Sequence, residues 1–439
     1  MPEVNFDGLI GPTHNYSGLS DGNIASKKNF SSPSYPKKAA LQGIKKAEIL
    51  INSGLQQGFF LPHERPFLPG LKQLGFTGSN EEILKSAYKF SKVLLSNFTS
   101  ASSMWAANAA TISPSFDTKD KKVHITPANL KSMFHRSIET EFTHKQCKLI
   151  FEENCFKVHE PAVSISGKGD EGAANHLRIS RSHNEKGFEI FVYGDSGFSR
   201  NNTSIKRQAL EVSKSIANNH NLDVENTFFL QQNSEAIEKG SFHNDIVSLS
   251  NENIFIAHEK AFQDKDELAK LLKTLESKID NFQYIEISDS EVPLNCIIDS
   301  YLLNSQLSTN GQNKMMLVLP EEVQSYKNCM AWLDKLRQIS DVKLFDFVNI
   351  KQSMMNGGGP ACLRLKVILD NDEIKKLNQK FLMNSERLDA IKSLIEREYR
   401  DILHPDDLLD PNLLAESRRV LDELTQIFDV GSIYEFQKL

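Results

Sequence analysis

One stretch of the sequence combines a signal for backbone structure with a signal for chemistry: Met354-Met355-Asn356-Gly357-Gly358-Gly359-Pro360-Ala361-Cys362-Leu363-Arg364-Leu365. Its three consecutive glycines lack side chains, so a ligand or another segment can approach their backbone closely. Pro360 stiffens the exit of this loop. From Leu363 to Asp370 apolar and polar residues then mostly alternate, which is typical of a strand. Cys362 therefore lies at the junction of a loop with room for a substrate and a predicted strand that can position its sulfur.

Two other interpretations of this stretch stay open. Free cysteines are often small buried apolar residues, and a nucleophilic one needs a base or a cation nearby. A glycine-rich loop can also bind phosphate. Here, however, no Gly-Lys-Ser/Thr follows, and the next predicted element is a strand and not the start of a helix.

The composition is that of a folded globular protein. The chain has 439 residues, of which 39% are hydrophobic and 25% charged, and its net charge is −6. This acidic balance argues against nucleic acid or an anionic membrane as the main partner. The five cysteines are odd in number and show no Cys-x-x-Cys spacing, which favours a reducing compartment. The sequence has no basic and apolar leader pattern and no run of about 18 apolar residues. We therefore expect a cytoplasmic protein that binds neither nucleic acid nor a membrane.

Short predicted strands, each opening into a polar loop, alternate with single helices from one end of the chain to the other. The pattern predicts a first strand from Val4 to Ile10 and helices from Lys37 to Ser53, around Ala128 to His135 and near Ser204 to Asn219. No Pro/Ser-rich linker interrupts this alternation, and no literal sequence repeat is visible. Residues 1–439 are therefore expected to form one α/β domain.

Three loop segments offer chemistry: Asp170-Glu171, His243-Asn244-Asp245 and Cys362. A thiol with a pKa of about 8.5 is mostly protonated at neutral pH, so a nucleophilic cysteine needs a cation or a base. His243 could act as that base and return the proton to a leaving group. Glu171 could orient the imidazole or bind a cationic substrate.

Each of these segments has another interpretation. An Asp-Glu pair after a glycine can simply complete a turn, and a His-x-Asp pair can be structural. If His243 and Asp245 lie on one strand they point the same way, so they could also bind a metal together with His124 or His135. No third ligand stands at a recognisable spacing.

Longer motifs resemble a known family. The chain resembles the N-succinylarginine dihydrolases, members of the pentein or amidinotransferase-like superfamily, nearly from end to end. The stretches that carry this resemblance are Val4–Leu9, Pro62–Phe67, Met104-Trp105, Ala107–Thr111, Phe134–Ser137, Gly169–His176, Phe242–Asp245, Tyr301-Leu302 with Asn304–Leu307, and Asn356–Arg364.

The resemblance implies a fold and a set of site residues. The fold would be a five-bladed α/β propeller of ββαβ-like units around a pseudo-fivefold axis. The family's catalytic positions fall on Glu171, His243 and Cys362. Its substrate contacts fall on Ser17, Gly18, Leu19, Ser20, Asp21, Gly22, Asn23, Ile24, Ala25, Ser26, Asn108, His135, Arg136, Arg207, Asp245 and Asn356.

The resemblance also implies an activity. The substrate would be N2-succinyl-L-arginine, hydrolysed in two cycles to N2-succinyl-L-ornithine, two ammonia and carbon dioxide through a covalent cysteine intermediate. Glu171 and Asp245 would hold the guanidinium, and Arg136 and Arg207 would pair with the anionic groups at the other end. The resemblance implies no metal and no organic cofactor, and it implies a homodimer. The alternatives are a related enzyme that stops after one step, such as an arginine deiminase or an amidinotransferase, and a binding protein without turnover.

Overall fold

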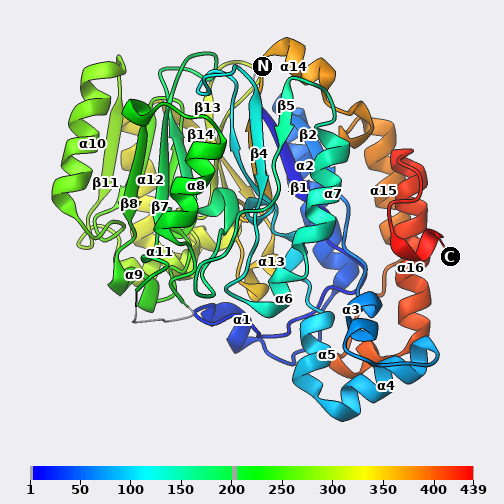
Figure 1. The fold of residues 1–439 in the computed structure, drawn as a ribbon. Helices are drawn as coiled ribbons and strands as arrows, with labels where there is room; N and C mark the ends of the chain where they lie inside the picture. The colour runs from blue at the N-terminus through cyan, green and yellow to red at the C-terminus, as the bar shows by residue number, and fades with distance from the viewer. Residues whose placement is uncertain (1–2, 200–204, 439) are drawn as a thin grey trace.

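The computed structural model describes residues 3–199 and 205–438, and their strands form five three-stranded sheets (Figure 1). In spatial order the sheets are β15 (Arg364–Ile368), β1 (Glu3–Gly8) and β2 (Gln56–Phe60); β3 (Ala110–Ser113), β4 (Val123–Pro127) and β5 (Phe156–Val158); β6 (His176–Ile179), β7 (Phe188–Tyr193) and β8 (Thr227–Gln231); β9 (Ser248–Asn251), β10 (Ile254–His258) and β11 (Gln283–Ile287); β12 (Gln306–Thr309), β13 (Met315–Pro320) and β14 (Val342–Val348).

The five sheets repeat one topology. In each, the middle strand pairs antiparallel with one neighbour and parallel with the other, as β1 does with β15 and β2. A parallel pair needs a crossover connection, and in every sheet this connection contains a helix. The chain therefore has an internal structural repeat for which its sequence shows no literal counterpart.

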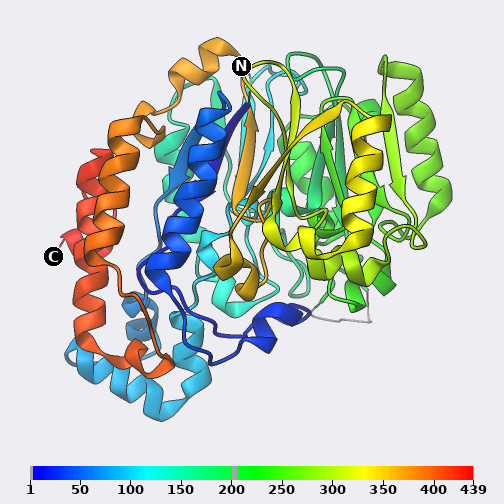
Figure 2. The same ribbon diagram turned by 180° about the vertical axis from the view of Figure 1, so that it is seen from behind.

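The helices surround the sheets (Figures 1 and 2). The longest helix in each parallel crossover is, in chain order, α2 (Pro36–Asn52), α7 (Thr140–Ile150), α8 (Leu210–Asn219), α10 (Lys265–Lys278) and α12 (Lys327–Ile339). The others are α1 (Ile24–Lys28), α3 (Leu68–Gln73), α4 (Asn80–Phe90), α5 (Lys92–Phe98), α6 (Phe134–Ser137), α9 (Ser234–Glu238), α11 (Leu294–Ser300), α13 (Lys351–Asn356), α14 (Asn371–Lys376), α15 (Ser385–Glu398) and α16 (Pro411–Phe428).

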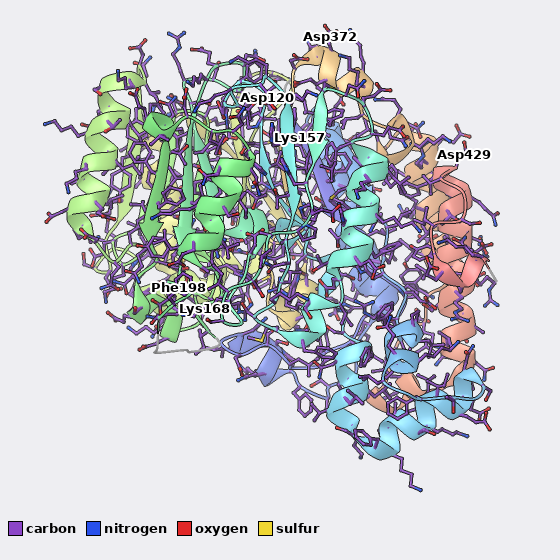
Figure 3. The ribbon with its side chains drawn as sticks, in the orientation of Figure 1. Asp120, Lys157, Lys168, Phe198, Asp372 and Asp429 are labelled. Carbon is purple, nitrogen blue, oxygen red and sulfur yellow. The ribbon has the colours of Figure 1, made fainter. Side chains whose placement is uncertain are left out.

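Local sequence explains why these helices form where they do. In α10 the Asp264 side chain accepts hydrogen bonds from the first-turn N–H groups, and Leu268, Leu271 and Leu275 form a buried stripe at helical spacing. The helices α15 and α16 pack on each other at the outer edge of the molecule. Exposed side chains such as Asp372 and Asp429 lie on its periphery (Figure 3).

The α/β class and much of the alternation predicted from the sequence are confirmed. The helix predicted from Lys37 to Ser53 is α2, with Pro36 at its first position. The helix predicted around Ala128 to His135 is wrong: only α6 (Phe134–Ser137) forms, because Leu130 has φ +49° and so breaks the helical path. The helix predicted near Ser204 to Asn219 begins at Leu210, and Ser204 lies outside the described residues. None of the described helices is long and apolar enough to cross a membrane.

Candidate functional site

The glycine-rich loop is packed against other segments at the end of α13. Gly357 has φ +103°, a conformation that favours glycine, and a Cβ added to it would lie 2.1 Å from the Asn23 side chain. A Cβ on Gly358 would lie 2.6 Å from Trp105 Nε1. The absence of side chains therefore allows close packing around Cys362, which lies three residues after the last glycine of the loop.

The Cys362 thiol is buried beside a carboxylate. Its side chain lies where β15 begins, and Cys362 Sγ donates to Asp245 Oδ2 at 3.5 Å. Burial and the nearby Asp245 raise the pKa of Cys362 well above its ordinary value, so it is a thiol in this state. Burial also raises the pKa of Asp245 to about 7, against hydrogen bonds from Cys362 and Asn304. A cation bound next to this pair would favour the charged form of both groups.

Glu171 forms the second half of the site. One of its oxygens accepts hydrogen bonds from Arg136 and, at 2.7 Å, from His243 Nε2. Arg207 Nη1 lies 3.9 Å from the same oxygen. Burial alone would raise the pKa of Glu171, but Arg136, His243 and Arg207 hold it well below its ordinary value. Glu171 is therefore a carboxylate throughout the physiological range.

The environment of His243 suits it to accept a proton. Burial lowers the pKa of His243 to about 4, against the favourable interaction with Glu171, so its imidazole is neutral at pH 7. A carboxylate can only accept hydrogen bonds, so His243 Nε2 carries the hydrogen and Nδ1 carries the lone pair. Nδ1 is buried and has no hydrogen-bond partner among the described residues. A ligand group next to Nδ1 could therefore donate a hydrogen bond or a proton to it.

Short connections between elements bring these two halves together. The turn Ala106–Asn108 links them, since Ala107 N–H donates to the Cys362 carbonyl at 3.1 Å and Asn108 Nδ2 donates to the Glu171 carbonyl at 2.6 Å. Asp245 lies in the turn Asn244–Ile246, directly after His243. The interpretation of His243 and Asp245 as neighbours on one strand is therefore wrong.

The predicted substrate-contact residues between Ser17 and Ser26 lie over the site. Ser20 Oγ is 3.2 Å from His135 Nε2, and Ser26 Oγ donates to Asn356 Oδ1 at 3.3 Å. The space that remains between this loop, His135 and Asn356 is about 10 Å³, room for one water at most. Within the segment Ile24 is different, because 58% of its surface is exposed. The loop thus covers the site in this structure.

Arg207 joins the same loop to the acidic centre. Its Nη2 donates to the Asp21 carbonyl at 2.6 Å, and its guanidinium stacks over the Phe242 ring at 4.4 Å. Arg136 is 1% exposed and bonds to Glu171. Arg136 and Arg207 are predicted to bind the anionic groups of the substrate. When no substrate is present, both lie beside a carboxylate of the chain itself.

Several buried polar atoms of the site have no hydrogen-bond partner among the described residues. The acceptors are Glu171 Oε1, Asp245 Oδ1 and His243 Nδ1, and the donors include Arg136 Nε and Nη2 and Arg207 Nε. Leaving such atoms unpaired is costly, so a polar ligand is expected to satisfy them. Both unpartnered acceptors and unpartnered donors are present, so the site can bind a ligand that carries cationic and anionic groups.

Asn304 is a site residue that the analysis of the sequence did not include among the candidate contacts. Its Oδ1 accepts from Gly359 N–H at 2.7 Å, and its Nδ2 donates to the Asp245 carbonyl at 3.2 Å. It thereby connects the glycine loop to Asp245. The only sequence signal for it was its place in the Asn304–Leu307 motif.

His124, considered as a metal ligand, lies in a different hydrogen-bond network. Its Nδ1 is 2.9 Å from His159 Nε2 and its Nε2 is 2.9 Å from Asp120. In the described part of the chain no group of three or more His, Cys, Asp or Glu side chains is arranged to hold a metal ion.

Solved structures with the same fold belong to enzymes of arginine metabolism. An arginine dihydrolase from the ornithine–ammonia cycle in cyanobacteria aligns with a TM-score of 0.53 and 14% identity over 84% of this chain, which corresponds to 41% of that longer protein. The N-terminal domain of the same enzyme, bound to its substrate, aligns with a TM-score of 0.50 and 15% identity over 83% of this chain and 98% of that domain. The chain is thus an α/β protein with the fold of the pentein enzymes, and a buried thiol, imidazole and carboxylates lie within that fold.

Sequence comparison identifies the family within that class. The family model of succinylarginine dihydrolase matches residues 1–437. N-succinylarginine dihydrolases of Aliivibrio fischeri and Marinobacter nauticus are 46% and 44% identical, over 99% of this chain and 99% and 98% of theirs. The chain belongs to the succinylarginine dihydrolase family, which confirms the resemblance of the sequence motifs.

Proposed function

We propose that this protein hydrolyses N2-succinyl-L-arginine with two waters to N2-succinyl-L-ornithine, two ammonia and carbon dioxide, as a step of arginine catabolism. Full-length family membership supports this activity. The observation that carries the mechanism is the set of unpartnered buried acceptors, Glu171 Oε1, Asp245 Oδ1 and His243 Nδ1, together with the contact of Asp245 with the Cys362 thiol. A guanidinium is planar and rich in N–H donors, and carboxylates hold it by charge-assisted hydrogen bonds.

In the first half of each cycle, Cys362 is the nucleophile. In the first cycle the bound guanidinium adds a positive charge beside Asp245 and the thiol, which favours the thiolate. The sulfur forms a bond to the guanidinium carbon, and the bond from that carbon to one nitrogen breaks. His243 Nδ1 takes the proton of the thiol as the carbon–sulfur bond forms and then gives it to the departing nitrogen, which leaves as ammonia.

In the second half, water replaces ammonia. His243 takes a proton from the water as its oxygen bonds to the S-linked carbon, and the carbon–sulfur bond then breaks to restore Cys362. The first cycle yields the ureido compound. The second consumes another water and ends with a second ammonia, carbon dioxide and the ornithine amine.

The remaining contacts concern the succinyl end. Arg136 and Arg207 supply buried guanidinium donors for the two anionic groups of the substrate, by rearranging around Glu171. The segment from Ser17 to Ser26, Asn108, His135 and Asn356 complete the enclosure. No organic cofactor or metal takes part in this scheme.

The larger assembly is also a proposal. The five repeated sheets would be the blades of a five-bladed propeller, and residues 1–439 one catalytic domain. The protein would act as a homodimer in the cytoplasm, on a small-molecule substrate, without a nucleic acid or membrane partner.

The test is the amount of ammonia released per molecule of N-succinylarginine consumed, with free arginine in parallel. We expect two ammonia and succinylornithine, and little reaction with free arginine. One ammonia with a citrulline-type product would instead indicate a one-step enzyme. The matched control for Cys362→Ala is Cys147→Ala, since Cys147 is also buried but lies in α7. Equal loss of activity in both variants would contradict the role of Cys362.

A further inference from the structure

A cavity on the other side of Asp245 lies where the five sheets meet. It has a volume of about 120 Å³, and one edge strand of each sheet contributes to its wall. These strands are β3 with Ile112, β6 with Leu177, β9 with Ser250, β12 with Leu307 and β15 with Lys366. The cavity is thus enclosed by all five repeats of the fold.

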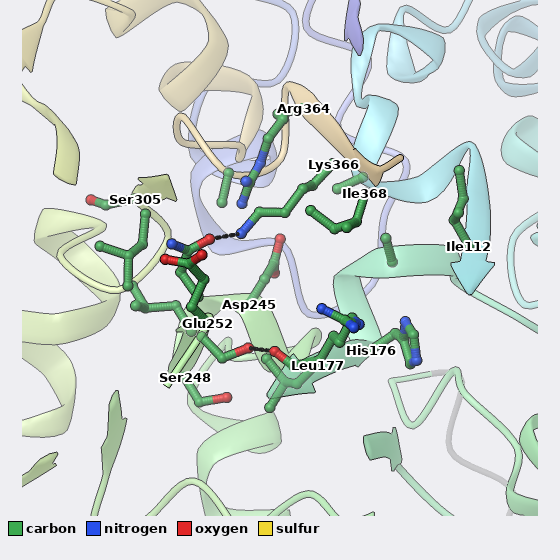
Figure 4. Close-up of a pocket in the computed structure, with 18 of the residues that line it drawn as sticks. Ile112, His176, Leu177, Asp245, Ser248, Glu252, Ser305, Arg364, Lys366 and Ile368 are labelled. Atoms are coloured by element: carbon green, nitrogen blue, oxygen red, sulfur yellow. Dashed lines mark hydrogen bonds between the residues drawn. The ribbon is translucent and has the colours of Figure 1, made fainter. Parts of the chain in front are cut away.

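The wall of the cavity combines apolar side chains with charged and polar ones, and the cavity is large enough for several waters. Figure 4 shows Arg364 and Lys366 extending into it from β15, toward Glu252 and Asp245. Lys366 Nζ donates to Asn251 Oδ1 at 2.6 Å. Ser250, Glu252 and Lys366 are half-buried, so water-sized molecules have access to them.

Asp245 belongs both to this cavity and to the proposed active site. Its Oδ2 accepts the hydrogen bond from Cys362, and its Oδ1 has no hydrogen-bond partner among the described residues. Ala361, next to the nucleophile, and Ala107 also contribute to the cavity wall. The cavity therefore extends to the carboxylate that contacts the proposed nucleophile.

The opposite, loop-covered side of the site is much tighter. The space beneath Ser17 to Ser26 is about 10 Å³, so this loop must move to admit a substrate and then covers it. In each proposed cycle one ammonia must leave, and one water must enter, at the guanidinium end while the rest of the substrate is still attached. That exchange cannot use the loop-covered side unless the loop opens each time.

We propose that the cavity behind Asp245 is a second opening of the active site, through which ammonia leaves and water enters during each cycle. This inference rests on the proposed function. The carboxylates of Asp245 and Glu252 and the amide of Asn251 offer acceptors to ammonium and water, whereas the cavity is too small to admit the succinylated substrate. The loop side would admit substrate once, and the cavity would serve both hydrolytic cycles.

The test narrows the cavity without changing a reacting group. Ser250→Phe places a large ring in it, and Ser277→Phe makes the same change on the exposed face of α10 in the same repeat. Ammonia formed is measured by acid quench with enzyme in excess of N-succinylarginine. Ammonia released is measured in parallel by a continuous coupled assay.

For Ser250→Phe we expect the first ammonia to form at the wild-type rate but to be released at least tenfold later. In Ser277→Phe and the wild type the two time courses should coincide. If the two time courses coincide in Ser250→Phe, ammonia does not leave through this cavity, and the proposed function is unaffected. Absence of ammonia from the wild type would overturn the proposed function itself. If Ser250→Phe does not fold, Ile112→Phe narrows the same cavity from β3 and gives the same two outcomes.

Discussion

Two adjacent buried carboxylates, Asp170 and Glu171, are expected to affect stability in opposite directions when their charge is removed. Both are fully buried. Glu171 has Arg136 and His243 as hydrogen-bond partners and Arg207 at 3.9 Å. Asp170 accepts hydrogen bonds only from neutral groups, including Gln208 Nε2. The perturbations are Glu171→Gln and Asp170→Asn, which change each carboxylate to an amide of nearly the same shape.

The magnitude for Glu171→Gln follows from the buried cations it would leave. At 3.9 Å, the attraction of Arg207 for Glu171 is about 4 kcal/mol at an effective dielectric constant of about 20. Removing one partner of a buried ion pair typically costs about 3–5 kcal/mol. We therefore expect Glu171→Gln to lower the free energy of unfolding by about 3–5 kcal/mol at pH 7.

The magnitude for Asp170→Asn follows from its pKa. Burial raises the pKa of Asp170 to about 6 from an ordinary value of 3.8, against hydrogen bonds from Gln208 and Gly172. Ionisation at pH 7 therefore opposes folding by about 3 kcal/mol. The asparagine variant avoids that cost, so its free energy of unfolding at pH 7 should equal or exceed that of the wild type.

The pH dependence gives each variant a second signature. The folded-state pKa of Glu171 is lowered, so its stabilisation is complete above its ordinary value of 4.5 and declines as the pH falls below it. The folded-state pKa of Asp170 is raised, so its destabilisation is present above pH 6 and disappears as the pH falls toward 3.8. Equilibrium unfolding in urea measures both, provided that the series extends from pH 8 to well below the ordinary Glu171 pKa of 4.5. A similar loss of stability in the two variants at pH 7 would refute the reasoning.

Three further predictions concern activity. Cys362→Ala should lose turnover while calorimetry still detects N-succinylarginine binding, because the thiol supplies the nucleophile and not the main contacts; unchanged turnover would contradict this role. Because burial raises the pKa of Asp245 to about 7, kcat/KM should rise with pH between 6 and 8 as the carboxylate forms, and Asp245→Asn should abolish that rise along with most activity. Asn304→Ala should lower kcat at least tenfold with little change in KM, since Asn304 holds the Gly359 N–H and the Asp245 backbone; a changed KM with normal kcat would speak against this.

The sequence predicted the individual helices and strands of this fold better than the pairing of strands that lie far apart along the chain. Alternating strands and helices follow from local periodicity, and α2 formed where Pro36 and Gly54 indicated. The repeated pairing of the five sheets has no sequence counterpart, because β1 pairs with β15 more than 350 residues away along the chain. Periodicity cannot report such pairings.

The same distinction applies to the site. Glu171, His243 and Cys362 were expected together from motifs, and the structure joins Glu171 to His243 across 72 positions and Asp245 to Cys362 across 117. Their catalytic roles stay predictions. The pairing of Arg136 with Glu171 and the linking role of Asn304 could not be predicted, because both depend on which side chains the packed fold buries side by side.

The unequal surroundings of Glu171 and Asp245 explain why a cationic substrate suits this site. Glu171 already has Arg136, His243 and Arg207 around it, so its negative charge is compensated before any ligand binds. Asp245 has the Cys362 thiol and the Asn304 amide as neighbours, and the attraction of Arg364 does not offset the burial that raises its pKa. A guanidinium at Asp245 supplies the missing positive charge and, through the same field, lowers the pKa of the thiol. In the first cycle the thiol therefore becomes most reactive when the guanidinium that it must attack is in place, whereas the neutral ureido group of the second cycle lacks this electrostatic help.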